Sequence, residues 1–314
     1  MTNAAHDDGL AGETIGMTSI SGFGFSTREG ARDMSLLDED LAGIAASGAQ
    51  FAEISAYAYD LIVGGRLLRE RVNRLKAICR RHELSYTVHG ALAVNFMDAA
   101  NLALHKRTCR AMLELCHEIE AAVMVHHSGF ARNQPQPALN ALHALECETL
   151  LEMAELAKGY GVRIAVENLF AFEPDRYTAQ PFKLAELLGQ LDHATICATL
   201  DVSHCYLACN DHGLDFVEAL HALAPFTGHL HIHDSFGLAH DFHGYTPSED
   251  NAFGIGDLHL PIGWGDIAWD TILPGLPVRD GTVFMVELPA HWWSELAPCA
   301  QEADRLVALM NAPR

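Results

Sequence analysis

The feature that most constrains the fold is a regular alternation of short apolar segments with longer amphipathic segments along the whole chain. The short segments have the length and composition of buried strands, and we expect eight of them, at residues 14–23, 50–56, 85–89, 122–127, 162–167, 195–201, 229–233 and 282–287. The amphipathic segments have helical periodicity, most clearly at residues 35–46, 67–81, 102–120, 139–158, 181–191, 215–223 and 302–310.

Eight strand–helix units in a chain of 314 residues predict an α/β protein with a single (β/α)8 TIM barrel. The alternative is a doubly wound open sheet, but no glycine-rich phosphate-binding motif follows any expected strand. Helix 139–158 is expected to end at Gly159, and residues 266–272 predict one more short helix. The first residues are small and acidic, so we expect a disordered tail at 1–12 and the barrel at 13–314.

The chain is strongly acidic, with 41 Asp and Glu residues against 20 Lys and Arg residues and a formal net charge of −21. This balance is a poor electrostatic match for a polyanion, so nucleic acid is not an expected partner. Eight cysteines without a CxxC pair suit reduced thiols in the cytoplasm. No apolar run is long enough to predict a membrane span, and the sequence leaves a homo-oligomer open.

Histidines are concentrated in the seventh expected strand, where His229, His231 and His233 alternate with Leu230 and Ile232. The three imidazoles therefore share one face of the strand. They are costly to bury unless each finds a partner, and a metal ion is one such partner. Hydrogen bonds to water, to carboxylates or to one another are the alternative. We expect His231 to be a metal ligand, with His229 deeper in the barrel and His233 nearer its mouth.

Ionisable residues also close most of the other expected strands from the third onwards, and further ones follow the sixth and seventh strands. Active sites of (β/α)8 barrels lie at the C-terminal ends of the strands, so these residues are candidates for one shared site. The nine candidates are His89, His127, Glu167, Asp201, His204, His231, Asp257, His259 and Glu287. Imidazoles and carboxylates without thiolates suit Zn²⁺, Mn²⁺ or Co²⁺. The pattern predicts a metal site, with a purely structural polar network as the alternative.

Five motifs resemble those of the xylose isomerase-like TIM-barrel superfamily, which contains sugar isomerases and epimerases and also the endonuclease IV family. They are Val166-Glu167-Asn168, Leu200-Asp201-Val202-Ser203-His204, His231-Ile232-His233-Asp234, Asp257-Leu258-His259-Leu260-Pro261-Ile262-Gly263-Trp264-Gly265 and Val286-Glu287-Leu288-Pro289. Their order and spacing are specific for the superfamily but do not select one activity.

The resemblance implies different metal contents for the two branches. In the sugar isomerase and epimerase branch a single divalent ion is typical, and the matching ligands are Glu167, Asp201, His231 and Glu287. The endonuclease IV branch holds three zinc ions, and the additional matching ligands are His89, His127, His204, Asp257 and His259. In that branch His-Pro-Gly usually stands where this chain has His127-Ser128-Gly129. The implied cofactor is therefore one to three divalent ions, Zn²⁺ or Mn²⁺.

The first functional hypothesis is a divalent-metal-dependent isomerase or epimerase that acts on a sugar or keto-sugar through an enediolate. By resemblance to the ketose epimerases, Glu167 and Glu287 move the proton next to the carbonyl, and His204 holds a substrate oxygen. The residues expected to contact the sugar are His233, Trp292 and Trp293. Packing into the core is an equally good role for the two tryptophans. The same chemistry supports a keto-sugar dehydratase or lyase.

The second hypothesis is an endonuclease IV-like trinuclear zinc phosphodiesterase acting on abasic DNA, which the nine-residue pattern favours. The loop at 55–63 carries no basic residue, whereas the endonucleases place Asn, Gln and Arg there. The loop at 237–256 also lacks Lys and Arg and contains Asp241, Glu249 and Asp250. Such loops would repel phosphates, so the sequence favours a carbohydrate substrate. A non-catalytic barrel ranks last because the candidate carboxylates are all present.

Overall fold

The structure, a computed structural model, describes residues 19–173, 175–239 and 244–313. The expected disordered tail at 1–12 lies outside the described residues, as does Asp241 of the acidic loop. The two acidic residues Glu249 and Asp250 lie within a short helix of that loop.

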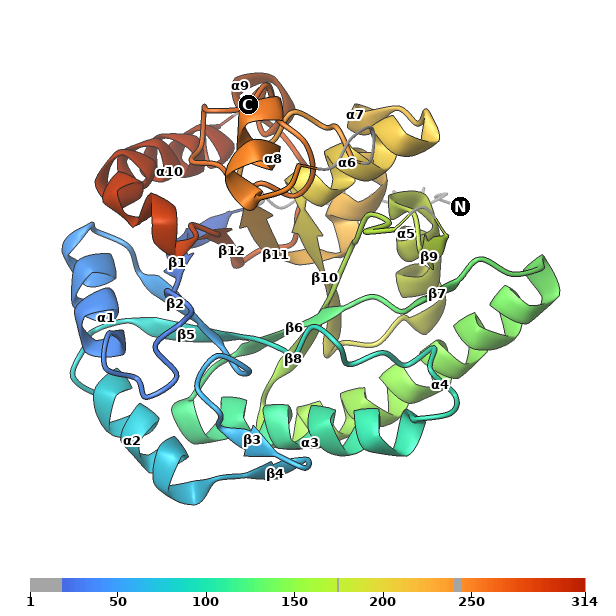
Figure 1. Cartoon of the computed structure of the whole chain (residues 1–314), viewed down its shortest axis with the longest axis horizontal. Helices are drawn as coiled ribbons and strands as arrows, with labels where there is room; N and C mark the ends of the chain where they lie inside the picture. The colour runs from blue at the N-terminus through green and yellow to red at the C-terminus, as the bar shows by residue number, and fades with distance from the viewer. Residues whose placement is uncertain (1–18, 174, 240–243, 314) are drawn as a thin grey trace, which may run out of the picture.

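Eight parallel strands close into a barrel, which confirms the predicted (β/α)8 fold (Figure 1). The barrel strands are β1 Ile20–Ser26, β2 Phe51–Ser55, β5 Ser85–His89, β6 Val123–His127, β8 Arg163–Glu167, β10 Ile196–Asp201, β11 Thr227–Ile232 and β12 Thr282–Val286. Two antiparallel pairs lie outside the barrel: β3 Ile62–Val63 with β4 Arg66–Leu67, and β7 Phe130–Arg132 with β9 Arg176–Thr178.

The helices surround the barrel and cover the outer face of its sheet (Figure 1). They are α1 Leu37–Ala46, α2 Arg69–Cys79, α3 Leu102–Ile119, α4 Gln136–Tyr160, α5 Pro181–Leu191, α6 Val202–His212, α7 Phe216–Leu223, α8 Pro247–Phe253, α9 Trp269–Ile272 and α10 Leu296–Met310. Two 3₁₀ helices complete the described elements, η1 Ala224–Phe226 and η2 Ala290–Glu295.

Most element boundaries differ from the sequence predictions by a few residues, and three of the differences have a clear physical reason or are large. The first strand, predicted at 14–23, continues to Ser26, because pairing with β2 reaches Ser26, which is opposite Glu53. Residues 14–18 of this prediction lie outside the described residues. Helix α4 passes through Gly159 and ends at Tyr160, since it is Gly161 that takes the left-handed conformation with a φ of 72° and closes the helix. The predicted final helix begins earlier, at Leu296.

Helix α6 was not predicted, because it follows β10 without an intervening loop. Asp201 ends β10 and also caps α6, where its Oδ1 accepts a hydrogen bond of 2.7 Å from the backbone N–H of His204. One residue thus terminates a strand and starts a helix, and this fixes the spacing between Asp201 and His204.

Alternation along each strand separates an apolar outer layer from a polar interior. In β11, Leu230 and Ile232 are buried in the main hydrophobic core, whereas the imidazole of His229 crosses the interior to reach Glu53 on β2. Every strand of the barrel runs in the same direction, so the strand ends that carry the candidate residues meet at one mouth of the barrel.

Candidate metal centre and active-site cavity

Four of the predicted ligands come together at the mouth of the barrel. The ligand atoms of Glu167, Asp201, His231 and Glu287 all lie within 4.8 Å of one another. His231 Nδ1 is 3.3 Å from Glu167 Oε1, 3.3 Å from Glu287 Oε2 and 3.9 Å from Asp201 Oδ2. The side chains are almost fully buried, with Glu287 the most accessible at 11% exposure. We call these four residues the central cluster.

The central cluster fits a divalent cation. Metal–ligand bonds of about 2.0–2.2 Å place neighbouring ligands about 2.8–3.6 Å apart, and both 3.3 Å separations lie in that range. Three carboxylates around one imidazole nitrogen would repel one another in a buried site without a positive charge between them. In addition, Glu167 Oε2 is buried without a hydrogen-bond partner. The donor set of nitrogen and oxygen suits Zn²⁺ or Mn²⁺.

Two further groups adjoin the central cluster. In one of them His204 Nε2 lies 3.2 Å and His259 Nε2 3.0 Å from Asp257 Oδ2, while His233 Nε2 lies 3.1 Å from Asp201 Oδ2. Because this group shares Asp201 through His233, it is continuous with the central cluster.

The other group contains His89 and His127, whose Nε2 atoms lie 3.5 and 3.4 Å from Glu167 Oε2. The structure therefore brings all nine candidates into one network of imidazoles and carboxylates. Both adjoining groups have a geometry that could hold a metal ion.

Without a metal ion, the network is held together by charge. Burial opposes the ionisation of Glu167, but the imidazoles of His231 and His127 hold the pKa of that carboxyl well below its ordinary value. Burial also opposes protonation of His231, yet the carboxylates of Glu287, Glu167 and Glu53 raise its pKa well above the ordinary value. Protons in the metal-free site thus occupy the place that a cation would take.

The pKa values of the adjoining histidines also depend on the balance between burial and neighbouring carboxylates. Burial lowers the pKa of His127 to about 4. Burial has the same tendency at His89 and His259, but Glu167 and Asp257 respectively outweigh it and raise both pKa values to about 9. Neutral and protonated imidazoles therefore lie side by side around the cavity.

The loop after β11 carries Asp257 and His259 and is held by Asp234. The Asp234 carboxylate accepts hydrogen bonds from the backbone N–H of Gly263 at 2.8 Å and from Trp269 Nε1 at 3.0 Å. A side chain at Gly265 would meet Asp234 Oδ1 at 2.3 Å, so only glycine allows this approach. The Gly-Trp-Gly motif is therefore explained by the fixing of this loop beside the central cluster.

The central cluster opens into a cavity of about 330 Å³. Its walls include Glu167, His204, Asp257, His259 and Glu287, together with residues that the strand-end rule does not find. They include Ser26 at the end of β1 with Thr27, Arg28 and Glu29 after it, Glu53 and Ser55 of β2 with Tyr57 after it, and Leu92 and Phe172. Arg28 is paired with Asp40 and Glu39, and Tyr57 donates a hydrogen bond to Glu29.

The residues expected to contact the sugar are not among those that line the cavity. His233 is fully buried and stacks on His259, with ring centroids 3.9 Å apart. The Trp293 ring lies 5.1 Å from the Arg28 guanidinium, and Trp292 packs edge-on against Trp264. None of the three lines the cavity, and both tryptophans pack against the main core. This is the packing role that the sequence left open for the tryptophans.

Glu53 on β2 is a buried member of the network that sequence reasoning missed. Its carboxylate lies 3.1 Å from the Nε2 atoms of both His229 and His231. The strand-end rule does not find it, because Glu53 is the middle residue of its strand. The signal that could have found it is a lone carboxylate in a short buried strand, flanked by Ala52 and Ile54.

The fold and this site define a class, a (β/α)8 barrel with a candidate metal centre at the C-terminal ends of its strands. The family model described as "Xylose isomerase-like TIM barrel" matches residues 41–309, and the chain belongs to this family. An uncharacterized protein of Methanocaldococcus jannaschii is 26% identical over 232 residues, which cover 72% of this chain and 72% of that protein.

Solved structures of the same fold include several sugar epimerases. A D-tagatose 3-epimerase-like protein has a TM-score of 0.68 and 20% identity, with 92% of this chain and 98% of that chain covered. The D-psicose 3-epimerase of Clostridium cellulolyticum H10, solved with D-tagatose, has a TM-score of 0.63 and 16% identity, with 92% of this chain and 100% of that chain covered. The IolI protein, solved with a bound zinc atom, has a TM-score of 0.63 and 19% identity, with 91% of this chain and 96% of that chain covered. At these identities the likeness shows the fold.

Among the described helices, none has both the length and the apolar composition needed to cross a bilayer.

Proposed function

We propose that the protein is a divalent-metal-dependent isomerase or epimerase that acts on a sugar or keto-sugar. The observation that carries this proposal is the convergence of Glu167, Asp201, His231 and Glu287 beside a cavity at the barrel mouth. A volume of about 330 Å³ lies within the range of about 300–1,000 Å³ that is usual for small-molecule sites. The similar structures named as ketose 3-epimerases support a carbohydrate as substrate.

Glu167, Asp201, His231 and Glu287 would hold the ion, which supplies Lewis-acid polarisation of a carbonyl oxygen beside the reacting carbon. Glu167 at the end of β8 and Glu287 directly after β12 reach the cavity from different strands. They can therefore flank a bound keto-sugar, so that one carboxylate removes the proton next to the carbonyl and the other returns it. The intermediate of this proton transfer is an enediolate.

The surrounding histidines are placed to bind hydroxyl groups. His204 lines the cavity, and its two ring nitrogens face Asp257 Oδ2 at 3.2 Å and the backbone carbonyl of Asn168 at 3.2 Å. These contacts fix the ring and engage both of its nitrogens. We therefore assign His204 to holding a substrate oxygen through Nε2, in exchange for its contact to Asp257. Loss of a β-hydroxyl from the same enediolate would be a dehydration, and therefore lyase chemistry is the nearest variant of the proposal.

A trinuclear phosphodiesterase is the second candidate, because the two groups that adjoin the central cluster could also hold ions. Charge opposes it. Among the described residues that line the cavity, Arg28 is the only Lys or Arg, and its guanidinium is already paired with Asp40 and Glu39. The wall instead carries Glu29, Asp257 and Glu287. Such a mouth would disfavour a phosphate backbone.

Solvent exchange tests the proposed function. The purified protein is incubated in deuterated buffer with a panel of ketoses and keto-sugars, with Mn²⁺, Zn²⁺ or Co²⁺, and carbon-bound deuterium is followed by NMR. We expect metal-dependent deuterium incorporation next to the carbonyl of at least one substrate, abolished by a chelator. Efficient, salt-sensitive incision of an abasic duplex, with no exchange into any sugar, would establish the second candidate instead.

A further inference from the structure

Glu53 lies beneath the central cluster, inside the barrel, and is fully buried. Its Oε1 is 3.1 Å from His231 Nε2, and its Oε2 is 3.1 Å from His229 Nε2. Thr87, its direct neighbour on β5, donates a hydrogen bond of 2.8 Å from Oγ1 to the same Oε2. Three side chains from two strands, Thr87 on β5 and His229 and His231 on β11, therefore point polar atoms at one carboxylate.

This arrangement determines which nitrogen of His231 carries a proton. An ionised carboxylate only accepts hydrogen bonds, so that the short contact to Glu53 requires a proton on His231 Nε2. The other ring nitrogen, Nδ1, faces Glu167 Oε1 and Glu287 Oε2, each at 3.3 Å. Metal binding needs a nitrogen without a proton, and the Nε2–H tautomer leaves Nδ1 free on the side of the central cluster.

We propose that Glu53 is a positioning residue that selects the Nε2–H tautomer of His231 and thereby presents Nδ1 to the metal ion. The inference rests on the metal site of the proposed function. Carboxylates that accept the second N–H of a ligating histidine fix its ring and raise its basicity. Glu53 itself is fixed by Thr87 and His229, so that it can hold His231 without moving.

The competing interpretation is that Glu53, His229 and His231 themselves bind an ion, since their ligand atoms also lie close together. The Thr87 hydroxyl argues against it. A hydrogen bond of 2.8 Å already occupies Glu53 Oε2, which is the oxygen that His229 also approaches. In addition, an ion held through His231 Nε2 would leave the three carboxylates around Nδ1 without their common partner.

The affinity for Zn²⁺, measured by competition with a chromophoric chelator, tests the proposal in Glu53→Gln. We expect a loss of about 10- to 100-fold, as is usual when an outer partner of a metal ligand is removed, with an unchanged number of ions at saturation. Thr87→Val is the matched control, because it removes one donor to Glu53 and leaves the His231 contact intact, and it should lose much less affinity. Unchanged affinity in Glu53→Gln, or the loss of one whole ion at saturation, would overturn the proposal.

Nitrogen-15 NMR of the histidine rings in the zinc-loaded wild-type protein gives a readout that needs no Glu53 variant. The His231 signals are assigned by their absence in His231→Asn, and we expect a proton on Nε2 and the metal on Nδ1. The opposite assignment, or a wild-type protein that binds no divalent ion, contradicts the proposal. A protein that shows this tautomer and the affinity loss, but exchanges no sugar proton, would instead contradict only the proposed function.

Discussion

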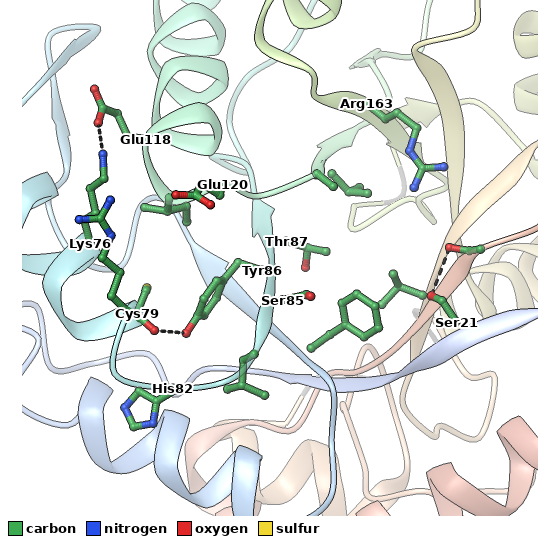
Figure 2. A pocket seen from close by; sticks show the side chains of 18 residues that line it. Ser21, Lys76, Cys79, His82, Ser85, Tyr86, Thr87, Glu118, Glu120 and Arg163 are labelled. Atoms are coloured by element: carbon green, nitrogen blue, oxygen red, sulfur yellow. Dashed lines mark hydrogen bonds and ion pairs between the residues drawn. The ribbon is translucent and has the colours of Figure 1, made fainter.

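The two ends of the barrel show that the size of a cavity does not identify a functional site. A cavity of about 420 Å³ lies at the N-terminal ends of the strands, whereas the cavity at the mouth is about 330 Å³. In the larger cavity, Lys76 pairs with Glu118 at 2.8 Å and the Tyr86 hydroxyl donates to the carbonyl oxygen of Cys79 (Figure 2). These polar groups satisfy one another locally, whereas those of the mouth converge on a common point.

The same strands supply both ends. In β8, Arg163 reaches the bottom cavity and Glu167 the mouth, and in β5 Ser85 and His89 do the same. Thr87 lines the bottom cavity (Figure 2). It also donates a hydrogen bond to Glu53, which lines the cavity at the mouth, so a single hydrogen bond links residues of the two cavities. What distinguishes the mouth is the presence of several buried imidazoles and carboxylates at distances that could hold a metal ion.

The largest expected effect is that of Glu287→Gln at the mouth. The change keeps the volume but removes both an anionic ligand and a proposed acid–base group, so turnover should fall by at least about 10³-fold. Circular dichroism should show an intact fold. Glu118→Gln at the bottom is the matched control and should keep activity, because Glu118 is a partly exposed partner of Lys76. Equal activity in the two variants would break the distinction between the two ends.

A second prediction separates two histidines of the same strand. His231→Asn removes a ligand of the central cluster, so its loss of metal affinity should exceed the range of about 10- to 100-fold that is typical for outer partners. His229→Asn keeps all four residues of the central cluster but weakens a buried contact to Glu53. It should therefore mainly lower the free energy of unfolding, by about 1–3 kcal/mol. Metal content and urea denaturation are measured for both variants. Equal metal loss would show that the depth assignment is wrong.

A third prediction concerns the groups around the central cluster. His127→Asn removes a side chain that lies 3.4 Å from Glu167 Oε2. If His127 orients Glu167 and binds substrate, we expect about a 10-fold change in KM or kcat with the metal count unchanged. A lower metal count together with loss of phosphodiester cleavage would show instead that the mouth holds several ions.

The smallest expected effect is the dependence of the folding stability of the metal-free protein on pH. His89 and His259 have folded pKa values raised to about 9, so they stabilise the fold fully below about pH 6.5 and lose this contribution as the pH rises through 9. His127, with a pKa of about 4, changes the stability only below about pH 6.5. The urea midpoint of the metal-free protein should therefore fall between pH 6.5 and 9. The urea midpoint of the metal-loaded protein should change less, because the ion replaces the protons. A urea midpoint that rises between pH 6.5 and 9 in the metal-free protein would contradict the prediction.

The sequence predicted the barrel because its strands are short apolar runs with clear limits. It predicted seven of the nine mouth residues because each lies at or just after a strand end, whereas Asp257 and His259 lie in the long loop after β11 and were found through their motif. It missed Glu53, whose partner His231 is 178 residues away in the chain, and it missed the wall residues Arg28 and Glu29, which belong to the loop after β1. Such contacts depend on barrel closure between β1, β2 and β12, which no local pattern encodes. The bottom cavity likewise arises from packing between helices and strand starts.

The divalent metal content of the protein, purified without added metal and measured by mass spectrometry, tests most directly whether the mouth is a metal centre. We expect at least one ion per chain in the wild-type protein and in Glu118→Gln, and a clear loss in His231→Asn. A wild-type protein that neither retains a divalent ion nor binds one on addition would contradict the assignment of Glu167, Asp201, His231 and Glu287 as its ligands.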